Sequence, residues 1–292
     1  MEHAEPQQLQ PPRLSRNYAT PTWVLPLAMV ALLVLAGPLL GLLVSIPWTR
    51  VPELVTTEEA STAFALSLVT AVGSTVICVL LGTPLSLWLQ QLSLRSARGR
   101  GGWLGRGGVA AIRLLVYAPL VLSPVVSGLA MIFFWGRRGL VGSWLDAHGI
   151  ALAYTTAGVM MVQVFVALPF FVATTTTALN AIPHQLEEAA ATEGASRGQV
   201  LARILLPLAA PGMVTGAVLS FARALSEFGA TITFAGNIAG ESRTIPLLVS
   251  LGLSSGDMDQ ALGACIMLLG IYVLVLVAVV AVRVIGRLRK SL

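Results

Sequence analysis

Two charged residues, Arg223 and Glu227, stand four positions apart in an otherwise apolar stretch of the sequence. Residues at this spacing lie one above the other on the same face of a helix. Because a charge at the centre of a bilayer costs at least about 2.5–3.5 kcal/mol on insertion scales, both side chains are expected to face the protein interior and to pair with each other. The pattern leaves two roles open: the pair lines or gates a translocation path, or it is a structural ion pair that fixes helix packing.

The sequence contains no motif for ATP hydrolysis, metal binding or nucleophilic catalysis. Its single lysine, Lys290, does not belong to the Gly-x-x-x-x-Gly-Lys-Ser/Thr loop that cradles phosphates. The three histidines, His3, His148 and His184, lie far apart on different segments, so no metal-ligand spacing is present. We therefore expect a chain that is not itself an enzyme and that binds no cofactor.

The composition places the chain in a bilayer. Of the 292 residues, 56% are hydrophobic and only 11% are charged, and the mean hydropathy is +0.84. A soluble domain carries about 25% charged residues, so the polar side chains are too few to cover the surface of a water-soluble globular protein. The expected location is the cell membrane.

Six windows contain the roughly 20 mostly apolar residues that a transmembrane helix needs. They are residues 23–47, 61–90, 112–135, 152–179, 209–235 and 260–284. These windows predict an all-α, polytopic membrane protein with six transmembrane helices. They form one domain, 23–285, between a polar tail, 1–22, and a basic tail, 286–292.

Positive charges collect on one side of the predicted spans. Thirteen of the 18 Lys and Arg residues lie in the two tails and in the second and fourth connections: Arg13, Arg16, Arg95, Arg98, Arg100, Arg106, Arg113, Arg197, Arg203, Arg283, Arg287, Arg289 and Lys290. Since Lys and Arg mark the cytoplasmic face, both termini are predicted to be cytoplasmic. The net charge of +5 then follows from topology and contact with membrane lipid, and nucleic-acid binding is not expected.

The fourth connection, residues 180–207, is too polar and too ordered for a plain linker. Pro183 suits a first helical turn, and Glu187 follows where the start of a helix favours negative charge. Gly194 breaks the run, Ser196 can cap a second short helix, and Pro207 marks the entry to the next span. The pattern indicates either a docking element for a partner protein or a helix pair that lies on the lipid surface.

A pattern within this connection resembles the EAA loop of ABC importer permeases, Glu-Ala-Ala-x3-Gly-x9-Ile-x-Leu-Pro. Every position of that pattern is filled here, by Glu188, Ala189, Ala190, Gly194, Ile204, Leu206 and Pro207. We call residues 180–207 the EAA-like loop. The resemblance implies the fold of a type I ABC importer transmembrane domain, with its core at about 60–285. It also implies that this loop contacts a separate ATP-binding subunit and that Gly194 allows the turn between two short helices.

The segment from Ser220 to Val249 is similar to the molybdate permeases. It reads SFARALSEFGATITFAGNIAGESRTIPLLV, and Pro119–Ala130 also looks like that group. Two positions differ from its usual pattern: Ser123 stands where proline is common, and Ser226 where glycine is usual. We expect Arg223, Glu227 and Gly229 in this segment to form the translocation path or its gate. Asn237, Glu241 and Arg243 follow in the outer loop, where a docked binding protein would be met; the alternative is a plain solvated loop.

The resemblance implies a permease that imports molybdate with energy from a partner. Two copies of the chain would form the path, two ATP-binding cassette subunits would carry ATP and Mg²⁺, and an extracytoplasmic binding protein would deliver the oxyanion. Sulfate, thiosulfate and tungstate remain alternative substrates. An ion-coupled secondary transporter is less favoured, because it needs several buried ionisable residues and only Arg223 and Glu227 are clearly within a span.

Overall fold

The computed structural model describes the backbone of residues 21–97 and 106–288. The chain divides into two compact units, Met1–Pro47 and Trp48–Leu292, and each is described by itself. The predicted division into 1–22, 23–285 and 286–292 stays a prediction. For several of the basic residues that predict the topology, either the whole residue or the side chain lies outside the described part of the chain. They are Arg13, Arg16, Arg98, Arg100, Arg106, Arg283, Arg287, Arg289 and Lys290.

All regular elements in the described ranges are helices, as predicted. They are α1 (Val24–Ser45), α2 (Val51–Val55), α3 (Glu58–Ala97), α4 (Arg106–Val121), α5 (Pro124–Trp135), α6 (Gly142–Ala147), α7 (Thr156–Asn180), α8 (His184–Thr192), α9 (Arg197–Val200), the π-helix η2 (Leu201–Leu205), α10 (Leu206–Leu225), α11 (Gly229–Ala235), α12 (Ile245–Ser255) and α13 (Met258–Leu288). Within these ranges, five helices are long and apolar enough to cross a membrane, or six when one bent pair counts as a span. The windows at 23–47, 61–90, 152–179 and 260–284 correspond to α1, α3, α7 and α13.

The third window, 112–135, is a bent pair of helices, which counts as one span only if both halves are taken together. Helices α4 and α5 meet at an angle of 119°. The break lies at Ser123, whose backbone is extended (ψ 151°) and whose hydroxyl accepts a hydrogen bond from the N–H of Val126. Pro124 causes the break, because the residue before a proline is forced out of helical conformation. Ser123 therefore starts α5 as its cap.

The fifth window, 209–235, also contains a break that the hydropathy pattern did not predict. Helix α10 ends at Leu225, and the short helix α11 begins at Gly229. Ser226 is the C-cap of α10, with φ −86°, a conformation that does not require glycine. Residues 226–228 are not helical and separate the two helices.

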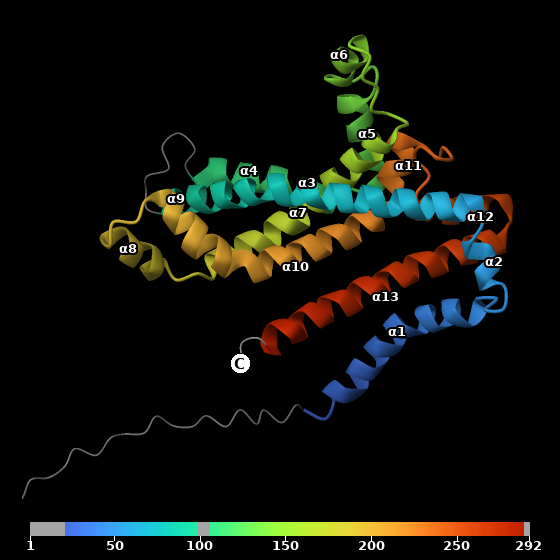
Figure 1. Ribbon diagram of the computed structural model, residues 1–292, viewed down its shortest axis with the longest axis horizontal. Coiled ribbons are helices and arrows are strands. Elements are labelled where there is room, and N and C mark those ends of the chain that lie inside the picture. The colour runs from blue at the N-terminus through green and yellow to red at the C-terminus, as the bar shows by residue number, and fades with distance from the viewer. Residues whose placement is uncertain (1–20, 98–105, 289–292) are drawn as a thin grey trace, which may run out of the picture. The chain divides into compact units, whose positions relative to one another are not determined.

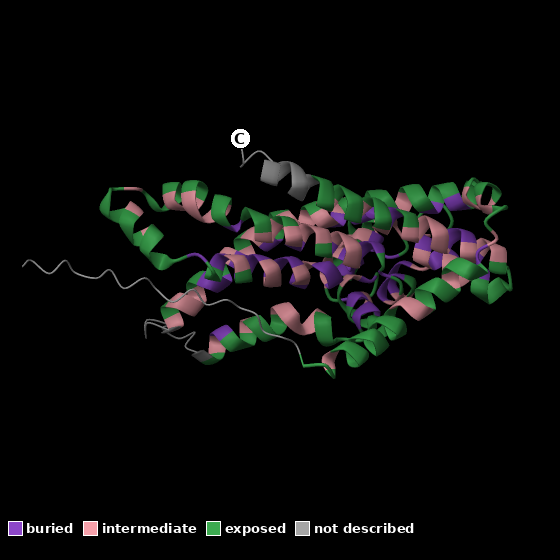
Figure 2. Ribbon diagram, turned by 90° about the horizontal axis from the view of Figure 1, so that it is seen from below, coloured by how far each residue is buried: buried purple, intermediate pink, exposed green. Residues whose placement is uncertain are grey.

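The unit Trp48–Leu292 is built around α3, α7 and α10, whose buried faces meet (Figures 1 and 2). Small residues allow this close approach: a Cβ on Gly82 would lie 2.4 Å from Cδ1 of Phe171. Gly216 on α10 is equally tight against Thr174 of α7. A helix satisfies nearly all its backbone groups internally, which a lipid environment requires, and neighbouring helices make it possible to tolerate the groups freed by Pro84, Pro169 and Pro211.

The two ends of this bundle differ in the elements that they carry. Helices α8 and α9 lie at one end, which we call the α8 end, whereas α2 and α12 lie at the opposite end, the α12 end (Figure 1). Helix α5 leads away from the bundle to α6. The EAA-like loop therefore lies at one end of the bundle, and the predicted path residues lie at the far end of α10 from it, where α10 gives way to α11.

Candidate functional site

The EAA-like loop starts where α7 ends, and its first short helix is α8. Pro183 is the N-cap of this helix, with extended backbone (φ −63°, ψ 128°). The prediction that it lies in the first helical turn is therefore wrong by one position, because the chain leaves α7 through an extended residue before a new helix begins. Glu187 lies in the first turn, where the helix dipole favours a carboxylate. Its Oε1 is 3.5 Å from Nδ1 of His184.

Gly194 follows α8 in left-handed backbone conformation, with φ +82°. The N–H of Ala195 donates to the carbonyl of Ala190 (3.0 Å), and the N–H of Gly194 donates to that of Ala191 (3.1 Å). This is the Schellman arrangement that stops a helix. A Cβ at Gly194 would meet no atom within 4 Å, so backbone conformation, and not lack of space, favours glycine here. The predicted turn between two short helices is confirmed.

The second half of the loop runs into α10 without interruption. Ser196 starts α9 with a capping box: its hydroxyl accepts from the N–H of Gln199 (3.3 Å), and Oε1 of Gln199 accepts from the N–H of Ser196 (2.8 Å). Pro207 lies in the first turn of α10, as predicted, although the helix is continuous with α9 and η2 over 197–225. The wide turn of η2 precedes Pro207, whose ring would clash with the carbonyl of Arg203 in a regular α-helix.

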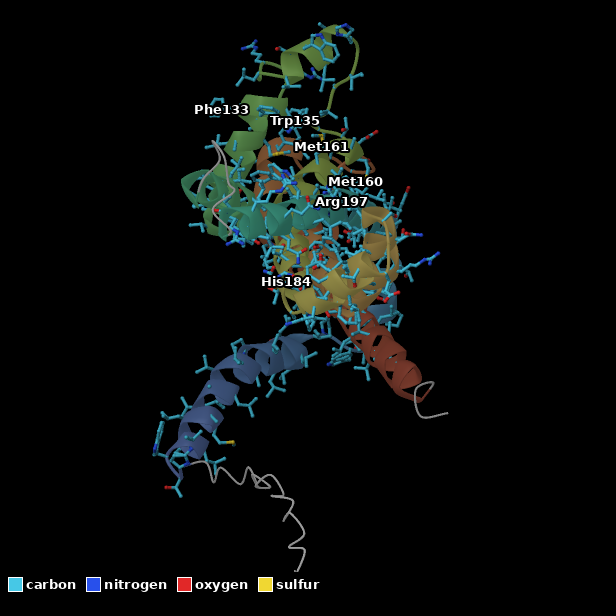
Figure 3. All side chains as sticks on the ribbon, turned by 90° about the vertical axis from the view of Figure 1, so that its left-hand side faces the viewer. Phe133, Trp135, Met160, Met161, His184 and Arg197 are labelled. Atoms are coloured by element: carbon cyan, nitrogen blue, oxygen red, sulfur yellow. The ribbon has the colours of Figure 1, made fainter. Side chains whose placement is uncertain are left out.

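The residues of the EAA-like pattern lie largely on the surface. Glu188, Ala189, Gly194 and Pro207 are exposed, and Ala190, Ile204 and Leu206 are half-buried. A pocket of about 580 Å³ lies between α8, α9 and the adjacent end of α3, and Glu188, His184 and Arg197 are among its lining residues. Figure 3 views this end of the molecule and labels His184 and Arg197. The loop thus presents a polar, concave surface that the described residues leave open.

The predicted ion pair between Arg223 and Glu227 is confirmed. Nη2 of Arg223 lies 2.6 Å from Oε2 of Glu227, and the two side chains are 28% and 1% exposed. The other carboxylate oxygen, Oε1, accepts a hydrogen bond from the N–H of Ala230 (2.8 Å). Both carboxylate oxygens therefore have partners, as a buried charge requires.

The pair joins two helices instead of lying on one, which corrects the prediction. Arg223 is in the last turn of α10, and Glu227 comes after that helix has ended. A cation at the C-terminal end of α10 and an anion before the N-terminal end of α11 both complement the helix dipoles. The arrangement fixes the turn between the helices, while the exposed part of Arg223 keeps the path or gate role open as a prediction.

Gly229, the third predicted path residue, is a packing position in this structure. A Cβ on Gly229 would lie 2.5 Å from Cβ of Pro124. One turn later, Gly128 packs against Thr233: a Cβ on Gly128 would lie 2.5 Å from Cβ of Thr233. Helices α5 and α11 therefore touch along small residues, and the break at Ser123 and the turn at Glu227 are held against each other. A role of Gly229 in the path stays a prediction.

The three predicted docking residues do not share one environment. Asn237 donates through Nδ2 to the carbonyl of Leu247 (3.1 Å), and its Oδ1 accepts from Nε of Arg243 (2.9 Å). Nη1 of Arg243 also lies 3.6 Å from Oε1 of Glu59 on α3. Glu241, in contrast, is exposed. The Asn237 and Arg243 side chains thus hold the loop to the bundle, and Glu241 alone faces outward; docking stays a prediction for all three.

Two residues that contribute to this region were not identified from the sequence. Glu59 pairs with Arg243, and the hydroxyl of Ser67 accepts from the N–H of Ile245 (2.7 Å) at the start of α12. Both contacts join positions more than 170 residues apart, so local patterns carry no signal for them. Among the residues that the structure describes, no three His, Cys, Asp or Glu side chains could hold a metal ion.

Comparison with known proteins gives consistent results. Residues 82–291 match the family described as binding-protein-dependent transport system inner membrane component. The Molybdenum transport system permease protein ModB of Mycobacterium tuberculosis is 42% identical over 266 residues, which are 91% of this chain and 96% of that protein. A probable molybdenum ABC transporter permease of Haloferax volcanii is 37% identical over 219 residues, 75% of this chain and 74% of that protein.

Solved structures show the same fold. A chain of a bacterial alginate ABC transporter, crystallised in complex with an alginate-bound periplasmic protein, superposes with a TM-score of 0.67 at 20% identity, covering 87% of this chain and 90% of that one. A chain of the MetNI methionine ABC transporter gives a TM-score of 0.54 at 20% identity, with coverage of 76% and 95%. Together with the matched family model, these observations show that this chain is a multi-pass membrane protein of the binding-protein-dependent transport system inner membrane component family.

Proposed function

We propose that this chain is the permease subunit of an ATP-driven importer of molybdate. The observation that carries this proposal is the EAA-like loop: every position of its pattern is filled, its residues lie largely on the surface, and Glu188 lines a pocket that the described residues leave open. A lipid-surface role is less favoured, because Glu187, Glu188 and Glu193 would be repelled by an anionic leaflet.

In the proposed assembly, two copies of the chain form the path and two ATP-binding cassette subunits grip the EAA-like loops. The ATP-binding subunits supply the energy, and ATP and Mg²⁺ bind to them. An extracytoplasmic binding protein delivers the oxyanion at the α12 end. Both termini and the α8 end then face the cytoplasm, in agreement with the distribution of positive charge.

The continuous helix from Arg197 to Leu225 provides a route for coupling. At about 1.5 Å per residue, it places Arg223 about 40 Å from Arg197. A movement of α8 and α9 with the ATP-binding subunits would therefore shift the far end of α10, where the Arg223–Glu227 pair meets α11. Release of the anion follows when the inward-facing state binds it more weakly than the state that received it.

Molybdate is the favoured substrate because relatives that cover most of the chain are named for molybdenum transport. A strain that lacks the gene, grown on limiting molybdate, tests this choice when sulfate uptake is measured alongside. We expect molybdate uptake to disappear, to return with the wild-type gene, and sulfate uptake to stay unchanged. Unchanged molybdate uptake, or loss of sulfate uptake in its place, would contradict the assignment.

A further inference from the structure

A second polar pocket, of about 240 Å³, lies between α3, α4 and α7. Its polar lining residues are Arg113, Tyr117, Thr176, Thr177 and Asn180. Asn180 is the last residue of α7, so the pocket opens near the α8 end of the bundle. Neither the EAA-like pattern nor the Arg223–Glu227 pair includes any of these residues.

The donors around this pocket suit an anion. Arg113 is the one charged residue among the described residues that line it, and no carboxylate is among them. Nη2 of Arg113 donates to Oγ of Ser93 (2.8 Å), which anchors the guanidinium, while an arginine has five N–H donors in all. Tyr117 lies one helical turn after Arg113, so both side chains project from the same face of α4.

Thr176 supplies a second, independent observation. Its hydroxyl is buried, the residue is 7% exposed, and Oγ1 has no hydrogen-bond partner within the described part of the chain. Thr174 and Thr177 each donate to the carbonyl four residues earlier, whereas Oγ1 of Thr175, which does not line the pocket, has no partner among the described residues either. A buried polar group without a partner is costly. Because Thr176 lines the pocket, a change of its rotamer would bring the hydroxyl to a bound ligand and satisfy it.

The end of α7 does not oppose an anion as strongly as a bare helix terminus would. The carbonyl of Leu179 accepts from Nε2 of Gln90 (3.2 Å), and the N–H of Ala181 donates to the carbonyls of Thr177 and Ala178. These contacts satisfy part of the negative end of the helix dipole.

We propose that this pocket binds the tetrahedral oxyanion group of a ligand, held by the guanidinium of Arg113 and the hydroxyls of Thr176 and Tyr117. Its volume is several times the roughly 30 Å³ that one water occupies, which leaves room for four oxygens around a central atom. The same group can come from two sources: the transported oxyanion, held before release, or the phosphate of a membrane phospholipid.

Each of the two sources has one structural observation in its favour. An adjoining groove of about 420 Å³ shares Ala173 and Thr177 with the pocket and extends to Thr215 of α10, which would continue a path for the ion. Leu114 and Leu115 beside Arg113 are 75% and 74% exposed, and acyl chains of a lipid would cover them. The first source rests on the proposed function, whereas the second does not.

The test uses the full-length chain purified with its ATP-binding subunit in dodecyl maltoside, a detergent that carries no phosphate. Binding of labelled molybdate is measured by equilibrium dialysis, and retention of added phosphatidylglycerol by native mass spectrometry. Thr176→Val keeps the side-chain volume and removes the hydroxyl, and Arg113→Gln removes the charge. Thr62→Val and Arg138→Gln are the controls, because both original residues are exposed and lie outside the pocket.

We expect the affinity for one of the two ligands to fall about tenfold or more in both pocket variants and in neither control, since hydrogen bonds to a charged group are among the stronger ones. The ligand that responds identifies the source. Equal affinity of wild type and Thr176→Val for both ligands would overturn the proposal. Molybdate uptake by the wild-type strain is measured separately. If the strain takes up molybdate although Thr176→Val binds both ligands like the wild type, the pocket proposal fails and the proposed function stands.

Discussion

The two ends of the bundle use their charged side chains in opposite ways. At the α12 end, Arg243 and Asn237 hydrogen-bond to each other and hold the loop to α3 and α12. At the α8 end, Glu188 and Arg197 are exposed on short helices around an open pocket. Polar groups that are satisfied within the chain build a rigid frame, whereas exposed groups on an ordered loop are available to a partner. Substitutions at the two ends should therefore fail in different ways.

The largest effect is expected from Arg223→Ala. Loss of the guanidinium leaves the 1% exposed carboxylate of Glu227 without its charged partner, and breaking a buried pair costs about 3–5 kcal/mol in soluble proteins. We expect molybdate uptake to be abolished. Uptake is measured per amount of protein in the membrane, so that loss of folded protein and loss of transport are separated.

Glu227→Gln is the matched variant, because the amide oxygen can still accept from the N–H of Ala230. We expect it to retain more protein in the membrane than Arg223→Ala and to transport poorly. Wild-type transport by Arg223→Ala at a normal protein level would show that the pair belongs to neither the path nor the frame.

Gly194→Val is expected to have the next largest effect, and only at the partner interface. A β-branched residue at φ +82° is strained, so the turn between α8 and α9 would change while the bundle remains folded. We expect recovery of the ATP-binding subunit in a pull-down to fall at least about tenfold, for a change of about 1.4 kcal/mol or more, with a normal amount of chain in the membrane.

Gly198→Ala is the control within the same loop. Gly198 lies in α9, its φ is not in the left-handed region, and an added Cβ would meet no atom within 4 Å. Equal loss of the ATP-binding subunit from both variants would show that the turn at Gly194 is not what the partner needs.

Arg243→Gln is expected to have a smaller effect, on stability. It removes the hydrogen bond to Asn237 and the ion pair with Glu59, which together contribute about 1–2 kcal/mol. We expect the Tm of the purified protein to fall by a few degrees. Glu241→Gln, at an exposed position of the same loop, should leave the Tm unchanged; an equal fall would remove the contrast between inward and outward side chains.

The smallest effect is expected from Glu241→Lys. Reversal of one exposed charge changes the approach of a partner more than the strength of the complex. We expect the association of the binding protein with the transporter to change a few-fold and to depend on salt, as measured by surface plasmon resonance. An unchanged rate would favour a plain solvated loop.

Much of the fold could be predicted from the sequence, since it depends on local chemistry. Apolar length predicts α3 and α7, and the Schellman turn at Gly194 and the capping box at Ser196 follow from residue types at fixed spacing. The break at Ser123 also has a local signal, because serine followed by proline starts helices. A hydropathy window does not detect it, since both halves of the bent pair are apolar.

The arrangement around Arg243 could not be predicted in this way. Its partner Glu59 lies 184 positions earlier on α3, and such a pair is set by how α3 and α12 pack. The same applies to the turn after Leu225, where Glu227 leaves the helix that carries Arg223. The pairing of the two charges was predictable from their cost in a membrane, but not which element carries each.

ATP dependence of transport by the purified complex tests the central claim most directly. The chain is reconstituted in vesicles with its ATP-binding subunit and the binding protein, and molybdate uptake is followed with and without ATP. We predict uptake that requires ATP and that is lost together with the ATP-binding subunit when Gly194 is replaced by valine. Uptake by the chain alone, in vesicles without ATP, would contradict the account.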